Sequence, residues 1–218
     1  MLVSEGGLCR AMNRAYKGGG YRVIPAEEGR TLVLAASTWA VSIPKTEFPR
    51  KALGLVVTHA GEIPCEPVRV CKDTPNQTMI PAAADALLVN LEGRGMDSEW
   101  ADPLPLVYNK REELGLFRER RRGPVRAFRM SDLDILDPDA DDLRPLVFGG
   151  VLGLWSDNEV SVWLCPWTFL GVELEHMEAL ARIGWEDSAG DEDARTMENG
   201  LDNLRLLGFE EGSSDGES

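Results

Sequence analysis

The residues that most suggest chemistry lie in one run, Arg118 to Asp142, whose charge changes sign halfway. Its first half carries six arginines: Arg118, Arg120, Arg121, Arg122, Arg126 and Arg129. Its second half carries six aspartates: Asp132, Asp134, Asp137, Asp139, Asp141 and Asp142. Glu119 brings the net charge of the run to −1. Arginines in such a cluster bind carboxylates of the same chain, a partner protein, or the phosphates of a nucleic acid.

A nucleic-acid surface needs positive potential over several phosphates, and here an equal number of aspartates follows the arginines closely. We therefore favour a salt-bridge network, within the chain or between subunits of a homo-oligomer, in which the aspartates pair with the arginines. A patch for a partner protein and nucleic-acid binding through Arg118 to Arg129 stay open as alternatives.

The acidic half does not match a calcium loop. Asp137, Asp139 and Asp141 have the spacing of the first three EF-hand ligands. The sixth position of that loop should be glycine and is Asp142, and the twelfth should be glutamate and is Phe148. We expect no metal site and no cofactor here.

Neither histidine indicates a catalytic centre. His59 lies near the end of a predicted helix, where a cationic side chain favours the helix dipole. His176 lies among glutamates on another predicted helix, which is typical of a solvated face. No nucleophile elbow, phosphate loop or zinc-protease motif occurs. We assign no catalytic residue and favour a non-enzymatic protein, with an unrecognised small enzyme as an alternative.

Tryptophans indicate a second kind of site. Trp155, Trp163, Trp167 and Trp185 cluster in the sequence around a predicted hairpin and helix. Most of these side chains are expected in the core. Because tryptophan also anchors protein interfaces, a groove for a partner protein there is a second hypothesis. The candidate binding residues are the six arginines together with Trp155, Trp163 and Trp167.

Charge and cysteines bear on the class of protein. The net charge is −14, and residues 186–218 contribute −9 of it (eleven acidic residues against Arg195 and Arg205). An acidic tail of this kind usually solubilises, and a mimic of DNA would spread its carboxylates more widely. The four cysteines lack the spacing of a zinc site or a disulfide framework, so we expect reduced thiols. No apolar run is long enough to cross a bilayer, and the first residues do not resemble a secretory signal. We expect a soluble, cytoplasmic protein without membrane contact.

The first part of the chain predicts helices and strands in alternation. A helix is expected from the Ser4 cap to Lys17, then a hairpin over 21–36, a strand over 38–44 and a helix over 46–60 with Thr46 as its cap. A short strand is expected over 67–71. Residues 81–91 fit a helix or a buried strand equally well. We assign 1–92 to an N-terminal α+β half.

The second part is expected to begin after a linker or long loop at 93–106, which is rich in glycine and proline. An amphipathic helix is predicted over 109–121 with Leu114 and Phe117 inward, then a hairpin around 156–158. A helix follows whose stripe of Leu170, Leu174, Met177 and Leu180 faces the core. A last helix over 191–207 completes a C-terminal half at 107–207, and 208–218 is expected to be a disordered acidic tail.

Two segments share the order strand, strand, proline, helix, glycine. Pro44 corresponds to Pro166 at an offset of 122, and Gly61 to Gly184 at an offset of 123. The order is consistent with two related ββα-containing halves. The sequence therefore predicts an α+β fold with a mainly antiparallel sheet and packed helices. It favours a cytoplasmic binding or regulatory protein that acts through protein–protein contacts.

Overall fold

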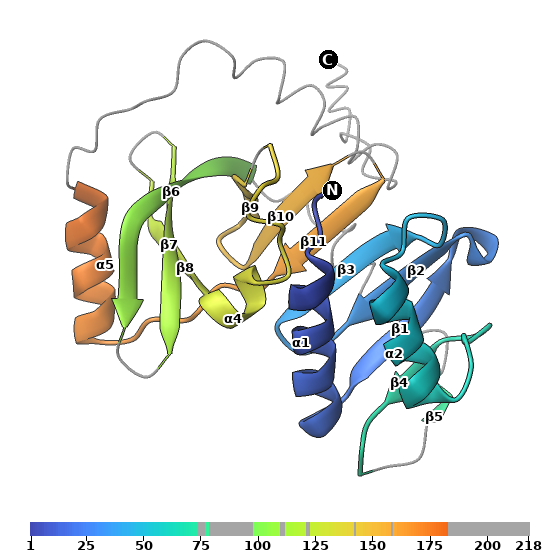
Figure 1. Ribbon diagram of the computed structural model, residues 1–218. Coiled ribbons are helices and arrows are strands. Elements are labelled where there is room, and N and C mark those ends of the chain that lie inside the picture. Colours follow the sequence, from blue (N-terminus) through green and yellow to red (C-terminus); the bar gives the residue numbers. More distant parts are fainter. Residues whose placement is uncertain are drawn as a thin grey trace, which may run out of the picture.

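The computed structural model describes residues 1–73, 77–78, 98–109, 112–120, 123–141, 143–157 and 159–182. The strands are β1 Tyr21–Ala26, β2 Thr31–Ala35, β3 Trp39–Pro44, β4 Val68–Val70, β5 Gln77–Thr78, β6 Ser98–Asn109, β7 Glu113–Glu119, β8 Val125–Arg129, β9 Leu146–Phe148, β10 Leu152–Asp157 and β11 Val160–Leu164. They form an antiparallel sheet in the order β5-β4-β1-β2-β3-β11-β10-β9-β6-β7-β8 (Figure 1). The helices are α1 Glu5–Lys17, α2 Arg50–Ala60, α4 Met130–Leu133 and α5 Val172–Arg182, with a 3-10 turn η1 at Glu27–Gly29. The predicted α+β class with a mainly antiparallel sheet is confirmed.

The N-terminal elements follow from local signals. The Ser4 hydroxyl accepts a hydrogen bond from the Gly7 N–H at 3.3 Å and so caps α1, as predicted. The predicted hairpin is formed by β1 and β2, and η1 turns the chain between them. Helix α2 ends where Gly61 adopts a left-handed conformation, φ +91°, which glycine takes without steric cost.

The predicted start of α2 is wrong. The helix begins at Arg50, after Pro49, and not at Thr46. Residues 45–48 form a turn that carries the Phe48 side chain into the core. Because that ring is buried, the helix begins about one turn later than predicted.

The predicted linker at 93–106 is wrong where the structure describes it, because residues 98–106 belong to β6. Two prolines in this segment suggested a break, but the strand accommodates both. The Arg120 N–H donates to the Trp100 carbonyl, so by alternation Pro103 lies where no N–H is needed toward β7. The register then shifts between Pro103 and Val107, in the manner of a β-bulge around Pro105.

The helix predicted over 109–121 is also wrong. Residues 113–119 form β7, which pairs with β6 on one side and β8 on the other. Leu114 and Phe117 are buried as predicted, but on opposite faces of the sheet. Both faces of β7 are covered, so its sequence lacks the alternation of a half-exposed strand, and tertiary pairing overrides its helical propensity.

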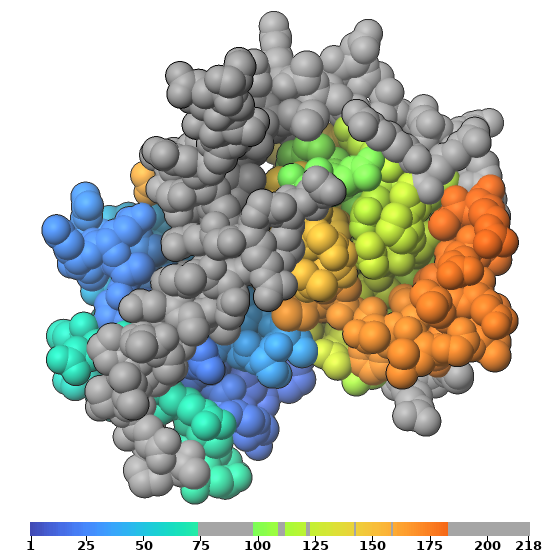
Figure 2. Space-filling model, turned by 180° about the vertical axis from the view of Figure 1, so that it is seen from behind, coloured from blue at the N-terminus to red at the C-terminus, as the bar shows by residue number. Residues whose placement is uncertain are grey.

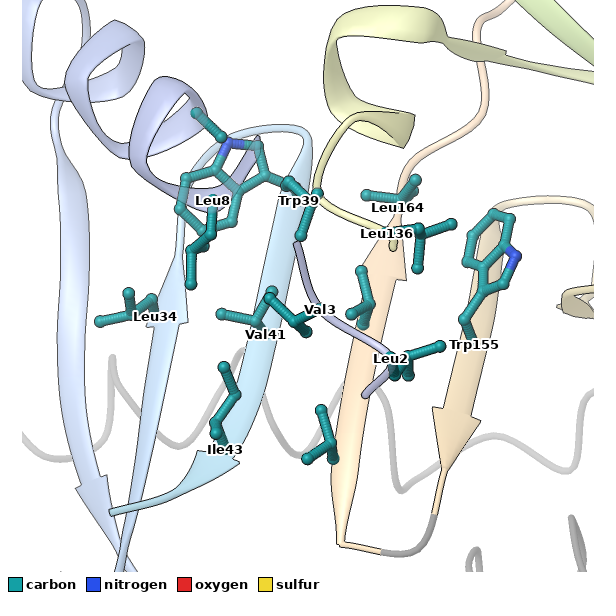
Figure 3. Packing of buried hydrophobic residues seen from close by; sticks show 14 of the residues in the cluster. Leu2, Val3, Leu8, Leu34, Trp39, Val41, Ile43, Leu136, Trp155 and Leu164 are labelled. Carbon is teal, nitrogen blue, oxygen red and sulfur yellow. The ribbon is translucent and has the colours of Figure 1, made fainter. Parts of the chain in front are cut away.

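One main core lies between the sheet and helices α1, α2 and α4. Its residues come from segments that are far apart in the sequence, for example Leu8 and Trp155 (Figure 3). The first residues of the chain contact several of these segments. Leu2 and Val3 are buried over the centre of the sheet, and Val3 forms a β-bridge with Leu136. The Ser4 N–H donates to the Ile135 carbonyl at 2.8 Å.

The two similar segments meet in the middle of the sheet. Strands β3 and β11 are neighbours, and residues 39–42 pair with residues 161–164. These stretches differ by 122 positions, the same offset as the two prolines, so the pairing has a local two-fold relation. The helices that follow diverge, since α2 packs on α1 whereas α5 packs on β8. An internal duplication stays a prediction.

Candidate binding groove at the edge of strand β8

Three arginines of the charged run form ion pairs with carboxylates of the chain. Arg120 Nε lies 3.3 Å from Asp102 Oδ2, and Arg126 Nε lies 2.7 Å from Glu119 Oε1. Arg129 Nε lies 2.6 Å from Glu112 Oε2. Arg118 is at the end of β7 and is half-buried. Arg121 and Arg122 lie outside the described residues.

These three arginines therefore have carboxylate partners, but mostly not the predicted ones. Their partners precede them on β6 and β7 or in the turn between, because neighbouring strands place these side chains together. Of the following aspartates, Asp132 lies 3.9 Å from Arg129 Nη1. Asp132 also lies 3.2 Å from Arg14 Nη2 on α1, and Asp134 lies 3.3 Å from Arg10 Nη2.

Asp137 and Asp139, two of the other aspartates of the run, form a local contact. The Asp137 carboxylate accepts a hydrogen bond from the Asp139 N–H at 3.1 Å, which is a local turn. Among the residues that the structure describes, no three His, Cys, Asp or Glu side chains are grouped to hold a metal ion. Asp142 is not described.

The tryptophans occupy three different environments. Trp155 is fully buried in the main core, where its indole N–H donates to the Leu143 carbonyl at 2.8 Å. Trp163 is buried on the opposite face of the sheet beside Leu154. Trp167 lines a cavity. Trp155 and Trp163 therefore belong to the hydrophobic core, whereas Trp167 lies at the surface. Trp185 lies outside the described residues.

The cavity at Trp167 has a volume of about 770 Å³ and is open to solvent along one side. We name it the β8–α5 groove. Its lining comes from the start of β8, the turn before β10, the segment after β11, and one face of α5: Pro124, Val125, Arg126, Gly150, Val151, Pro166, Trp167, Thr168, Phe169, Leu174, Met177, Glu178, Ala181 and Arg182. Figure 2 shows α5 and the segment leading into it beside strands β6–β8.

The groove combines a packed floor with exposed apolar walls. Phe169 and Met177 are buried together with Val125 against the face of β7 and β8. Leu174 is 47% exposed and Val151 is 58% exposed. Leu174 and Leu170 were predicted to face the core, but both are exposed, whereas Met177 of the same predicted stripe is buried.

Charged groups stand at the rim. Arg182 Nη2 lies 3.8 Å from Glu178 Oε2 along α5, and both side chains are mostly exposed. Arg126 packs against the Gly150 backbone so closely that any side chain at Gly150 would overlap its guanidinium. The Arg129 guanidinium lies 4.8 Å from the centre of the Trp167 ring, a cation–π contact that fixes one side of the indole.

His59 lies in a separate aromatic cluster. Its ring stacks on Tyr16 with 3.8 Å between ring centres, and its Nδ1 lies 3.0 Å from the Tyr21 hydroxyl. Burial lowers the pKa of His59, which favours the neutral ring over the cationic form predicted from the helix end. Burial also raises the pKa of the Tyr21 hydroxyl. His176 lies on the exposed side of α5.

Sequence reasoning located this region through its tryptophans but missed most of the groove. Leu174 and Met177 were assigned to one inward stripe, and Val125 and Phe169 carried no signal of their own. The chain matches no protein-family model, no curated protein and no solved structure. In the described part of the chain, no helix has the length and apolar character needed to span a bilayer.

Proposed function

We propose that this protein is a non-enzymatic binding protein that holds a partner protein in the β8–α5 groove. The observation that carries the proposal is the pairing of exposed Leu174 and Val151 with a buried aromatic floor in one cavity. Large apolar side chains that stay exposed around a concave site mark interaction surfaces. Trp167 supplies an aromatic anchor of the kind that dominates interface energetics.

The size of the cavity also suits a small molecule, but the apolar surface continues beyond it. Leu170 is 75% exposed and Val172 is 63% exposed, and both lie on the chain between the groove residues Phe169 and Leu174. A ligand confined to the cavity would leave these side chains in water, whereas a protein partner would cover them. The four free cysteines support the expectation of a cytoplasmic setting.

The test compares two matched variants, Leu174→Glu in the groove and Val57→Glu on α2. Val57 is 39% exposed, so both changes place a carboxylate at a half-exposed helical position. C-terminally tagged proteins are used to capture partners from the native host, with quantitative mass spectrometry as readout. We expect Leu174→Glu to reduce capture of the specific partner at least about tenfold, because binding would bury an unpaired carboxylate.

Val57→Glu is expected to capture the same partner as the unaltered protein, and both variants should melt within a few degrees of it. Equal capture by all three proteins would show that the groove is not the binding surface.

A further inference from the structure

We propose that the partner binds in extended conformation, as one added strand at the start of β8, on the edge with which no other described strand pairs. This inference rests on the proposed function and specifies the form of the ligand that the groove takes. It is carried by the direction of the main-chain groups along β8, by the two walls of the groove, and by the charges at its rim.

Strand β8 directs some of its main-chain groups away from β7. The Glu119 N–H donates to the Pro124 carbonyl at 3.2 Å, so residue 124 directs its carbonyl toward β7. Main-chain groups alternate along an antiparallel strand, so those of Val125 and Ala127 point away from β7. The Ala127 carbonyl confirms this direction, because it accepts the Trp167 N–H at 2.7 Å.

Two neighbouring positions on this edge thus have different surroundings. The Ala127 carbonyl is covered by the chain's own segment at Trp167, whereas Val125 lies beside the groove that it helps to line. The N–H and C=O of Val125 are directed into that space. An added strand pairs with groups of this kind, and its main-chain hydrogen bonds supply affinity.

The two walls of the groove lie on opposite faces of the sheet, as the side chains of an added strand would. Val125 projects toward Phe169 and Met177 on one face of the sheet, whereas its neighbour Arg126 belongs to the opposite face and packs on Gly150. The groove therefore wraps around the edge of β8, between α5 and the turn before β10. A strand placed there sends alternate side chains to the two walls, apolar ones toward α5 and polar ones toward Arg126.

The charges at the rim select the partner. Arg126 and Arg182 both line the groove. Arg126 pairs with Glu119, which lies outside the lining, and Arg182 pairs with Glu178, the one carboxylate in it. A segment with acidic residues between its apolar ones complements this rim. A second copy of the chain, paired edge to edge, would bring another Arg126 and Arg182 against the first pair. We therefore assign the groove to a different protein with an extended, alternately apolar and acidic segment.

The experiment uses the full chain, labelled with ¹⁵N, and a synthetic peptide of alternating glutamate and leucine with blocked ends. Two analogues carry N-methyl groups, one on all leucine nitrogens and the other on all glutamate nitrogens. In a bound strand the leucine N–H groups share one edge and the glutamate N–H groups the other. We expect one analogue to lose binding at least about tenfold and the other to bind like the parent.

The Val125 N–H signal should shift on titration with the parent peptide, and its hydrogen exchange should slow. A peptide with lysine in place of glutamate should bind more weakly, and Leu174→Glu should abolish binding of the parent. Equal binding of both methylated analogues, an unmoved Val125 signal, or no binding of the parent peptide would each overturn the added strand. A dimer of the chain that Leu174→Glu dissociates would assign the groove to a second copy instead.

The two proposals fail separately. If partner capture from the host depends on Leu174 while the peptide results contradict an added strand, the binding function stands and only the extended mode is lost. If capture is indifferent to Leu174, the proposed function is lost whatever the peptides do.

Discussion

Helices α2 and α5 have eleven residues each, and each follows a hairpin and a proline. They differ in how their apolar side chains are buried. Helix α2 packs beside α1 and buries Ala52 and Val56 in the main core. Helix α5 lies against β8, and Met177 is its only fully buried residue. A helix whose apolar stripe exceeds what its fold covers has surface left for binding, and the groove lies beside such a helix.

The tight packing of the α1 layer gives the largest expected effect. A Cβ at Gly7 would overlap the Asp134 carbonyl oxygen, so Gly7→Ala must push α1 away from residues 134–135. We expect a loss of about 3 kcal/mol in the free energy of unfolding, measured by chemical denaturation. Gly54→Ala is the matched helical control on α2, where a Cβ meets no atom within 4 Å. It should raise stability by up to about 1 kcal/mol. Similar losses for both variants would mean that the α1 layer is not closely packed.

The contact between α1 and α4 gives an intermediate effect. The Asp132 side chain is only 6% exposed and lies beside Arg14 and Arg129. We expect Asp132→Ala to lower the free energy of unfolding by about 2 kcal/mol, because it removes a buried, charged acceptor. Arg14 and Arg129 then keep the Ser131 carbonyl and the Glu112 carboxylate as acceptors. Asp134→Ala removes the exposed pair with Arg10 and should cost less than about 0.5 kcal/mol. Equal costs would indicate that burial of Asp132 contributes nothing.

His59 gives the smallest effect, and it is confined to one range of pH. Because burial lowers its pKa below the ordinary value of 6.5, the unfolded chain binds a proton more readily than the folded one. The contribution of His59 to stability is therefore full above pH 6.5 and decreases as the pH falls through and below that value. His59→Gln should reduce the difference in melting temperature between neutral and mildly acidic buffer. An unchanged difference would mean that the ring titrates as it does in water.

Local signals predicted the N-terminal region well because its elements are decided by nearby residues, such as the Ser4 cap and the Gly61 stop. The region around β6 and β7 could not be predicted in this way. Charged residues on both sides of Leu114 and Phe117 resemble a helical face, and the prolines of β6 resemble a linker. Pairing among the successive strands β6, β7 and β8 decides their conformation.

The candidate site was also predicted only in part. The abundance of tryptophan indicated the region of Trp167, but Trp155 and Trp163, which precede it in the sequence, are buried in the core. The residue types predicted that the arginines would form ion pairs with carboxylates. The strand register determined which carboxylates are their partners. The edge of β8 at Val125 is a property of topology, and nothing in the sequence around Val125 indicates that its main-chain groups face outward.

The pairing of β3 with β11 has a consequence for how the chain is made. Val41 lies opposite Val162, so the centre of the sheet joins residues that a ribosome produces far apart in time. Until β11 has been synthesised, β3 exposes an unpaired strand edge, and Leu2 and Val3 lack the residues that cover them. Such distant pairings are slow to form, and open strand edges invite association between chains. Slowing synthesis between β3 and β11 should therefore favour aggregation of nascent chains, and holdase chaperones should relieve it.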